Sequence, residues 1–548
     1  MNQDERSGGS MSELMAGLKM LARRVLRRPG LLPLGSEYRR RPGFSVVRVN
    51  GLEVVARDVV AAQPWHQSAQ LARRCQQLFA DAGIECWAIH PLGSRVFEWS
   101  VRRSDFARAV QTVSREFTGE AIYLKAKPSI GVPTLVDDLD PAALGSASFI
   151  DVFQYVHDQW GRVFPDYVAC RVVPWDPSDR GTLVCRDREA VIQEIEDLSP
   201  IPVVEVPSWD GASLPRPAIL AEPDPSEVAF PIDAVYMWVD DSDPAWRARR
   251  DAVVEGAVEP ESDSDSEAQA PARYRDRGEL RASFRSLELY APWIRTIYLV
   301  TDRQRPSWLD PDSSRVVIVD HRDIFEDPSV LPSFNSHAIE SQLHRIPGLS
   351  EYYLYLNDDV LFNVPVSPTD FFTPQGKLKV VLSRSHRPLI DHSKLTPLEQ
   401  ARANSARLLE RDFGRLVTKL FAHVPFAQSK ALAAEVSAAY AEEIAATVSH
   451  PFRCGEDYVI TSWLFLYTAL FTGRAVPSTL TFAYFNVAQE ESRRRMAAWD
   501  RFAAAAVLCV NDSPDQTSEE HSATLEAWLR QLYAVPTAYE LRGSTPEA

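Results

Sequence analysis

The chain contains 548 residues, which is too long for one hydrophobic core and predicts two to four domains. Hydrophobic residues make up 45% of the chain and charged residues 24%, as in soluble globular proteins. The net charge of -16 argues against a general nucleic-acid-binding protein, because neutralising a phosphate backbone requires a basic face.

The N-terminal segment, residues 1–40, is basic. Leucines at helical spacing lie beside lysines and arginines between residues 11 and 28, and these charges interrupt any signal peptide. The segment forms either a peripheral amphipathic helix on the inner face of the cell membrane or a solvated helix. No run of about 18 apolar residues occurs, so no membrane-spanning helix is expected. Six cysteines without a Cys-x-x-Cys pair predict a cytoplasmic protein.

Residues 44–206 are expected to form a smaller α+β N-terminal domain of unknown role. Its first half has the order strand, helix, strand, strand, helix, strand, which resembles a ferredoxin-like module. These elements are expected at residues 45–49, 68–82, 85–89, 96–101, 106–117 and 121–125. A proline-rich linker follows at residues 207–231, because prolines at this density disfavour regular elements.

Residues 232–535 are expected to form an α/β catalytic domain. Apolar strands alternate with helical patterns as far as about residue 374, which predicts a mostly parallel sheet covered on both faces. An acidic stretch at residues 255–272, rich in Ser, Ala and Pro, is typical of a disordered loop. Residues 397–449 are rich in Ala and Leu and predict a helical insertion.

Adjacent acids follow one of the predicted strands. The apolar run at residues 352–356 ends in Asn357, Asp358 and Asp359. Adjacent carboxylates repel each other, so a cation is expected to neutralise them. Acids also follow three upstream strands, at Asp240, Asp302 and Asp320. Because ligands of parallel sheets bind beyond the carboxyl ends of the strands, this pattern predicts a metal and ligand site there.

Further polar clusters have both functional and purely structural interpretations. Asp240 suits a ribose or a base, whereas Asp243 is better explained as a helix cap. Arg277, Arg281 and Arg285 lie four residues apart on one helical ridge. This ridge could grip a diphosphate, or it could be a solvated face paired with neighbouring glutamates.

Two later groups of residues are equally open. The stretch around Asn335 and Glu340 suits a phosphate or sugar hydroxyl at a helix start, although a plain N-cap explains it as well. Downstream, polar side chains stand in apolar surroundings, and a lone histidine in such a setting is usually a core residue. They are His423, Arg453, Asp457, Asn511 and Asp512.

Taken in order, these motifs resemble the four conserved blocks of the Stealth family. This family includes bacterial capsular and exopolysaccharide phosphotransferases and the animal enzyme that adds N-acetylglucosamine 1-phosphate to lysosomal glycoproteins. The matching blocks are residues 232–246, 273–359, 423–457 and 509–512, within roughly half of the chain. Two departures, Asp241 in place of Gly and Ala282-Ser283-Phe284 in place of Tyr-Ser-Leu, bear on the turn geometry or the donor pocket.

The resemblance implies transfer of a sugar 1-phosphate from a nucleotide diphosphate sugar, such as a UDP-sugar, to a glycan hydroxyl. Phosphoryl transfer depends on positioning and charge neutralisation. In this interpretation His423 is the general base, Asp457 orients it or acts instead, and Arg281 and Arg453 stabilise phosphate oxygens. Mg²⁺ or Mn²⁺ is held by Asp358, Asp359 and Asp512. The donor is bound by Asp240, Asn335, Glu340 and Asn357.

Two other functions fit the same residues. A metal-dependent glycosyltransferase would use Asn357, Asp358 and Asp359 in the same way but would release UDP rather than UMP. An inactive glycan-binding scaffold would show neither metal-dependent donor binding nor turnover. The sequence does not determine the sugar, the acceptor glycan or the oligomeric state.

Overall fold

The structure is a computed structural model that describes residues 38–541. Within this span the description leaves out residues 50, 61, 90–96, 128–129, 160, 165–168, 187–190, 209–212, 257–273, 499–504 and 512–517. The predicted membrane-binding helix, all but two residues of the predicted loop 255–272, and Asp512 therefore lie outside the described residues. Among the helices that are described, none has the combination of length and apolar character that crossing a bilayer requires.

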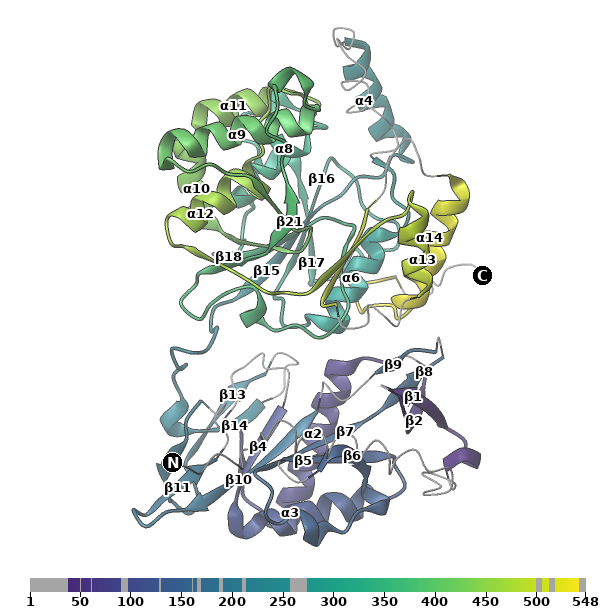
Figure 1. The fold of residues 1–548 in the computed structure, drawn as a ribbon, viewed down its shortest axis with the longest axis vertical. Coiled ribbons are helices and arrows are strands. Elements are labelled where there is room, and N and C mark those ends of the chain that lie inside the picture. The colour runs from purple at the N-terminus through teal and green to yellow at the C-terminus, as the bar shows by residue number, and fades with distance from the viewer. Residues whose placement is uncertain are drawn as a thin grey trace, which may run out of the picture.

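The N-terminal part carries helices α2 (Pro64–Asp81) and α3 (Arg103–Glu116), close to their predicted positions. It forms a separate body below the C-terminal part in the view of Figure 1. Its strands are β1 (Phe44–Val49), β2 (Leu52–Val59), β3 (Cys86–Trp87), β4 (Phe97–Arg102), β5 (Ile122–Lys127), β6 (Ile130–Leu135), β7 (Phe149–Gln154), β8 (Val156–Asp158), β9 (Val163–Phe164), β10 (Cys170–Pro177), β11 (Thr182–Cys185), β12 (Glu194–Glu196), β13 (Val203–Pro207) and β14 (Ser213–Pro217).

The predicted ferredoxin-like arrangement is wrong. Strand β1 pairs with β2 in a sheet of order β1-β2-β8-β9, whereas β4 and β5 belong to a second sheet. In that sheet β5 lies between β7 and β6, and β4 pairs with β3 and β10. The reason is the turn at Gly51, whose φ of 82° suits glycine and returns the chain antiparallel along β1. This hairpin removes β1 from the sheet that the other strands form.

The predicted linker at residues 207–231 is partly regular. Strand β13 pairs antiparallel with β14 from Val203↔Pro217 to Pro207↔Ser213. A two-stranded ribbon has only edge strands, and these tolerate proline because no second neighbour requires its N–H. The boundary between domains at this place stays a prediction.

The C-terminal part is built on a five-stranded sheet of order β17-β16-β15-β18-β23. Strands β15 (Ile232–Met237), β16 (Ile297–Thr301), β17 (Val316–Asp320) and β18 (Tyr352–Leu356) are parallel, and β23 (Phe426–Ser429) is antiparallel. The prediction of a mostly parallel sheet is confirmed. The other strands are β19 (Val360–Phe362), β20 (Leu378–Val380), β21 (Leu382–His386), β22 (Lys419–Phe421), β24 (Ala475–Pro477), β25 (Phe482–Asn486) and β26 (Val507–Asn511).

Helices lie on both faces of this sheet, with α6 on one face and α8 on the other. The helices of the C-terminal part are α4 (Pro244–Gly256), α6 (Glu279–Tyr290), α7 (His321–Ile324), α8 (Ser336–Glu340), α9 (Pro397–Phe413), α10 (Lys430–Ala439), α11 (Ala441–Ser449), α12 (Leu466–Phe471), α13 (Glu490–Ala497) and α14 (Glu519–Leu532). Residues 397–449 are not purely helical, because β22 and β23 lie among their helices and β23 forms the edge of the main sheet.

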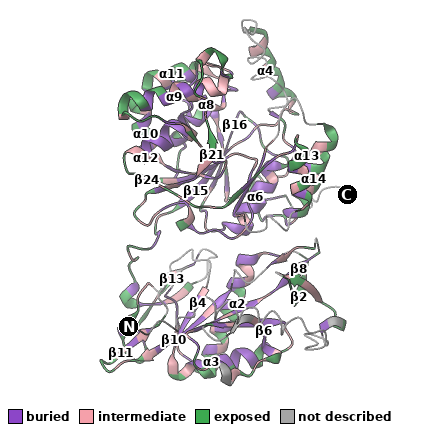
Figure 2. Ribbon diagram, in the orientation of Figure 1, coloured by how far each residue is buried: buried purple, intermediate pink, exposed green. Residues whose placement is uncertain are grey.

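The core explains why these strands are apolar along their whole length. On β15, Tyr236 joins the cluster that contains Phe284 of α6, whereas the neighbouring Val235 joins the cluster that contains Ile339 of α8. Successive side chains of a strand point to opposite faces, so the central strands β15, β16 and β18, which are covered on both sides, are buried over nearly their whole length. Figure 2 shows the buried residues concentrated along the central strands and α6.

A buried ion-pair network fixes the C-terminal segment to α6. Both carboxylate oxygens of Glu540 accept hydrogen bonds of 2.7 Å, from Arg285 and from Arg281. Glu540 is only 4% exposed and Arg285 is equally buried. Breaking a buried pair on one side leaves the other charge uncompensated, which costs far more than losing a surface pair.

We therefore expect Glu540→Gln to lower the free energy of unfolding of the C-terminal part by about 3–5 kcal/mol. Glu490→Gln is the matched control, because Glu490 pairs with Arg494 on the exposed surface of α13, and its loss should cost less than about 1 kcal/mol. Urea unfolding followed by tryptophan fluorescence measures both. Equal effects of the two substitutions would contradict a stabilising role of this network.

Candidate active site

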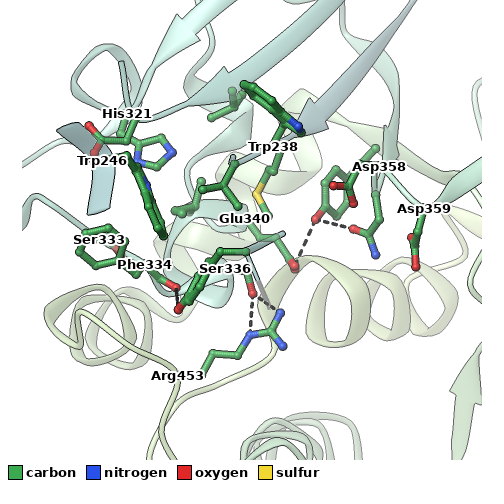
Figure 3. A pocket seen from close by; sticks show the side chains of 18 residues that line it. Trp238, Trp246, His321, Ser333, Phe334, Ser336, Glu340, Asp358, Asp359 and Arg453 are labelled. Atoms are coloured by element: carbon green, nitrogen blue, oxygen red, sulfur yellow. Dashed lines mark hydrogen bonds between the residues drawn. The ribbon is translucent and has the colours of Figure 1, made fainter. Parts of the chain in front are cut away.

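The candidate site lies at the carboxyl ends of the parallel strands. Trp238 follows β15, Asp302 follows β16, and Asn357, Asp358 and Asp359 follow β18. All five side chains line one cavity of about 250 Å³, part of which is drawn in Figure 3. The position agrees with the ligand site expected for a parallel sheet.

Asp358 and Asp359 lack the partners that would balance two neighbouring charges. The Oδ1 atom of Asp359 is buried and accepts no hydrogen bond from any described residue, and its Oδ2 atom accepts only the Cys509 thiol at 3.5 Å. Burial raises the pKa of Asp359 to about 6. The pKa of Asp358 is raised well above its ordinary value by burial and then by the charge of Asp359. The two acids are thus held together at an energetic cost.

Two further acids, Asp276 and Glu279, contribute to this negative charge. Their repulsion also raises the pKa of Asp358. Burial, followed by repulsion from Asp276, raises the pKa of Glu279 itself to about 8. Asp276 accepts a 2.9 Å hydrogen bond from the Trp238 indole. Neither acid was predicted to act at this site, although Asp276 lies shortly before the arginine-rich helix α6 and Glu279 is its first residue.

These acids fit a hard divalent cation. Carboxylate oxygens without hydrogen-bond donors are the ligands that Mg²⁺ and Mn²⁺ prefer. The Oδ1 atom of Asp359 is such an oxygen and Asp358 lies beside it, whereas Asp276 and Glu279 already accept hydrogen bonds from Trp238 and from the Arg277 backbone. The donor set therefore agrees with the expected metal, and Asp358 and Asp359 are the residues that could hold it.

Glu340, at the end of α8, is a buried carboxyl with a free oxygen. Its Oε1 atom accepts a 3.2 Å hydrogen bond from the Tyr355 hydroxyl, and its Oε2 atom has no partner among the described residues. Burial raises the pKa of Glu340 to about 7, against the opposing charge of Arg453. In Figure 3, Glu340 lies between the Asp358–Asp359 pair on one side and Trp246 on the other. Such a group can gain or lose a proton near neutral pH.

Arg453 joins the start of α8 to the site. It comes from the loop between α11 and the π-helical segment Ile460–Phe465, and its Nε atom donates a 2.6 Å hydrogen bond to the Ser336 hydroxyl. Ser336 and Arg453 both line the first cavity. They place a guanidinium and a hydroxyl in the same cavity as the acids, where both could donate hydrogen bonds to a bound phosphate.

A second cavity, of about 490 Å³, shares part of the wall of the first. Glu340, Tyr355, Asn357 and Arg453 line both, whereas His423 lines only the second. Burial, and then the charge of Arg402, lowers the pKa of His423, so its imidazole is neutral at pH 7 and able to accept a proton.

Arg402 is a cation that the sequence analysis missed. It lines the second cavity, and burial lowers its pKa, with Arg453 contributing further repulsion. No hydrogen bond or ion pair of its side chain is found within the described residues. No sequence signal identifies it, because it lies in an Ala-rich stretch of α9 that is typical of any amphipathic helix. The second cavity is therefore electropositive where the first is acidic.

Two of the predicted site residues have structural roles here. Asn335 is fully buried, caps α8 by accepting from the His337 amide at 3.0 Å, and donates to Asp457 at 2.9 Å. Asp457 hydrogen-bonds to His337 and His450 rather than to His423. Neither Asn335 nor Asp457 lines the two cavities. The expectation that Asp457 orients His423 is wrong, because its carboxylate is already committed to other partners.

Asp240 and Arg281 lie together in a third cavity. The guanidinium of Arg281 pairs with Glu540, which leaves it turned toward the C-terminal segment. The Oδ1 atom of Asp240 accepts from the Ser242 amide at 2.8 Å in a local turn. The structure thus does not bring these two residues to the acids and His423. Asn357 does lie there, as predicted, with its Oδ1 atom accepting from the Tyr355 hydroxyl at 3.0 Å.

Comparison with known proteins places the chain in a family. Models of conserved regions 1, 2 and 3 of Stealth proteins match residues 230–256, 273–380 and 422–470. Exopolysaccharide phosphotransferase SCO2594 of Streptomyces coelicolor is 36% identical over 541 residues, covering 90% of this chain and 88% of the relative. The chain belongs to the Stealth family. The resemblance found in the sequence is thereby confirmed.

Other Stealth relatives match over a smaller share of their length. Exopolysaccharide phosphotransferase SCO6023 of the same organism is 40% identical over 68% of this chain and 64% of the relative. The chain spans only 47% of SCO2592 and 58% of SCO6021. Among solved structures, a galactosyltransferase LgtC in complex with donor and acceptor sugar analogues has 12% identity and a TM-score of 0.31 over 56% of this chain and 96% of that chain. That similarity is too low to inform the fold or the site.

We expect Asp359→Asn to stabilise the metal-free protein at about pH 7.5. When folding raises the pKa of a carboxyl, the folded protein loses stability as the pH rises from the unfolded pKa, here near 3.8, to the folded pKa of about 6. Above that range the full loss of stability remains. Removing the charge should recover on the order of 1–3 kcal/mol.

Mg²⁺ should stabilise the unsubstituted protein and have little effect on the Asp359→Asn variant. Thermal unfolding with and without the ion measures this difference. Asp179→Asn, at an exposed position of the N-terminal part, is the control and should respond to Mg²⁺ as the unsubstituted protein does. An unchanged Mg²⁺ response in Asp359→Asn would exclude this acid as a metal ligand.

Proposed function

We propose that the protein transfers a sugar 1-phosphate from a nucleotide diphosphate sugar to a glycan hydroxyl, as the names of its relatives suggest. One observation carries this proposal. The cavity lined by Asp358 and Asp359, which form no ion pair within the described residues, shares a wall with a second cavity lined by the neutral His423. An acidic metal site next to a proton acceptor is what phosphoryl transfer to a hydroxyl requires.

The first cavity suits the donor. Trp246 and Phe334 line it with aromatic rings, 5.3 Å apart between centroids, that offer stacking surfaces for a nucleobase or a sugar. Asp358 and Asp359 would hold Mg²⁺ or Mn²⁺, which when bound supplies positive charge to the diphosphate. Arg453 adds a cationic donor, fixed in place by its hydrogen bond to Ser336.

The second cavity suits the acceptor. The acceptor oxygen forms a new bond to the phosphorus that carries the sugar, the pyrophosphate P–O bond breaks, and the nucleoside monophosphate leaves. The bond between the sugar and its phosphate is untouched, so the anomeric configuration is retained. The acceptor proton passes to a base on the protein. Positive charge from Arg402 and Arg453 lines the same cavity.

Two side chains could take that proton. His423 is neutral at pH 7 and lines the second cavity. Glu340 lines both cavities and has an unpaired oxygen, so it lies where donor and acceptor would meet. We propose His423 as the base. Glu340 is the alternative, because its Oε2 atom accepts no hydrogen bond from the described residues and is free to take a proton.

Product analysis tests the reaction class. Incubation with a UDP-sugar, Mg²⁺ and a glycan acceptor should release UMP and give a product that contains phosphorus. A metal-dependent glycosyltransferase, which the acids after β18 would also serve, would release UDP and give a product without phosphorus. Release of UDP alone would therefore replace the proposed reaction with glycosyl transfer.

A pH profile distinguishes the two bases. Each acts in its deprotonated form, so the rate should rise with pH and level off above the pKa of the base. An inflection near pH 7 indicates Glu340, whereas an inflection below 6.5 indicates His423.

We expect His423→Ala to lower the rate by roughly 10²–10⁴ and to leave donor affinity unchanged. His386→Ala, an exposed neighbour, is the control. Near-normal turnover of His423→Ala would exclude this base.

A further inference from the structure

The loop between α11 and the π-helical segment Ile460–Phe465 gathers three side chains that commonly bind metals. They are His450, Cys454 and Asp457, spaced four and three residues apart. None of the three lines the donor or the acceptor cavity. This cluster is therefore separate from the acids after β18, and its existence does not depend on the proposed reaction.

The potential ligand atoms are close to tetrahedral spacing. The Cys454 Sγ atom lies 3.2 Å from the Nδ1 atom of His450 and 3.4 Å from the Oδ1 atom of Asp457, and these last two atoms are 2.8 Å apart. A tetrahedral zinc ion with bonds of about 2.0–2.3 Å separates such ligand atoms by about 3.3–3.6 Å. The three atoms would need to move by about half an ångström or less to surround an ion.

Hydrogen-bond partners fix the orientation of the Asp457 carboxylate. Its Oδ2 atom accepts hydrogen bonds from the Asn335 amide group at 2.9 Å and the Cys454 backbone at 3.1 Å, and it lies 3.3 Å from the Nδ1 atom of His337. Oδ1 is thus the atom turned toward His450 and Cys454. Partners that orient a ligand from behind are typical of protein metal sites.

Burial and chemistry favour one class of ion. Asp457 is fully buried, whereas His450 and Cys454 are half-buried, so an ion can enter from solvent and keep a water molecule as its fourth ligand. Thiolate and imidazole are soft or intermediate ligands that suit Zn²⁺ and similar transition metals and not Mg²⁺. One thiolate and one carboxylate also balance a charge of two.

We propose that His450, Cys454 and Asp457 form a site for one transition-metal ion of the Zn²⁺ class. The ion would fasten the loop 450–457 to the start of α8 through Asp457, and this loop carries Arg453, whose guanidinium reaches Ser336 at the first cavity. The site is structural and positions Arg453. It takes no part in the chemistry itself.

Cobalt spectroscopy of the full chain tests the site. The untagged protein is stripped with a chelator, desalted and titrated with Co²⁺. Co²⁺ bound by the acids after β18 would have only oxygen ligands and would add no thiolate band. We expect one equivalent to show a thiolate-to-metal charge-transfer band and a tetrahedral visible spectrum, and Zn²⁺ to displace it. Excess Mg²⁺ should not displace it, and Asp359→Asn should retain it, because the acids after β18 belong to a different site.

Substitutions assign the ligands. Cys454→Ser should abolish the charge-transfer band and weaken Zn²⁺ binding by at least about 10-fold. His450→Asn retains the thiol and should weaken binding by a similar factor, which covers the case in which Cys454→Ser does not fold. Cys86→Ser removes the other half-buried cysteine and should leave the spectrum unchanged.

The proposal is overturned by three results. The first is a stripped protein that binds no Co²⁺, and the second is a spectrum without a thiolate band. The third is a Zn²⁺ affinity that is the same in the unsubstituted protein and in His450→Asn. In any of these cases His450, Cys454 and Asp457 serve only as the hydrogen-bonded cluster that the structure shows.

Discussion

The structure depends on an unfavourable interaction, the repulsion among carboxylates at the carboxyl ends of the parallel strands. Asp358 and Asp359 line the same cavity, neither forms an ion pair within the described residues, and Asp276 and Glu279 add to their negative charge. Such an arrangement persists only because the sheet, buried on both faces, is stable enough to hold it. A cation or substrate that neutralises these carboxylates would recover the stability that their repulsion costs. This is a common feature of sites organised for phosphate chemistry.

The two cavities are connected by side chains from distant parts of the chain. Glu340 ends α8, Tyr355 lies near the end of β18, and Arg453 belongs to a loop 117 residues after Ser336, the first residue of α8. Each contributes to the wall that the first and second cavities share. The positions of α8 and of the 450–457 loop therefore control both halves of the site.

The sequence predicted the sheet and the acids after β18, since both follow from local patterns: apolar runs the length of a strand, and adjacent charges at their ends. It could not predict that Arg281 pairs with Glu540, because that partner lies 259 residues away and no spacing rule connects them. The N-cap at the start of α8 was one of the two interpretations that the sequence offered, and Asn335 forms it. The commitment of Asp457 to His337 was missed because these residues lie 120 positions apart. Arg402 gave no signal, because its environment exists only after folding.

Strand β23 has a consequence for how the family can diversify. It begins three residues after His423 and forms the edge of the main sheet, although it lies within residues 397–449, which are mostly helical. The insertion is therefore not an appendage that can be exchanged like a surface loop. Exchanging residues 397–449 for those of another family member would therefore replace an edge strand of the main sheet.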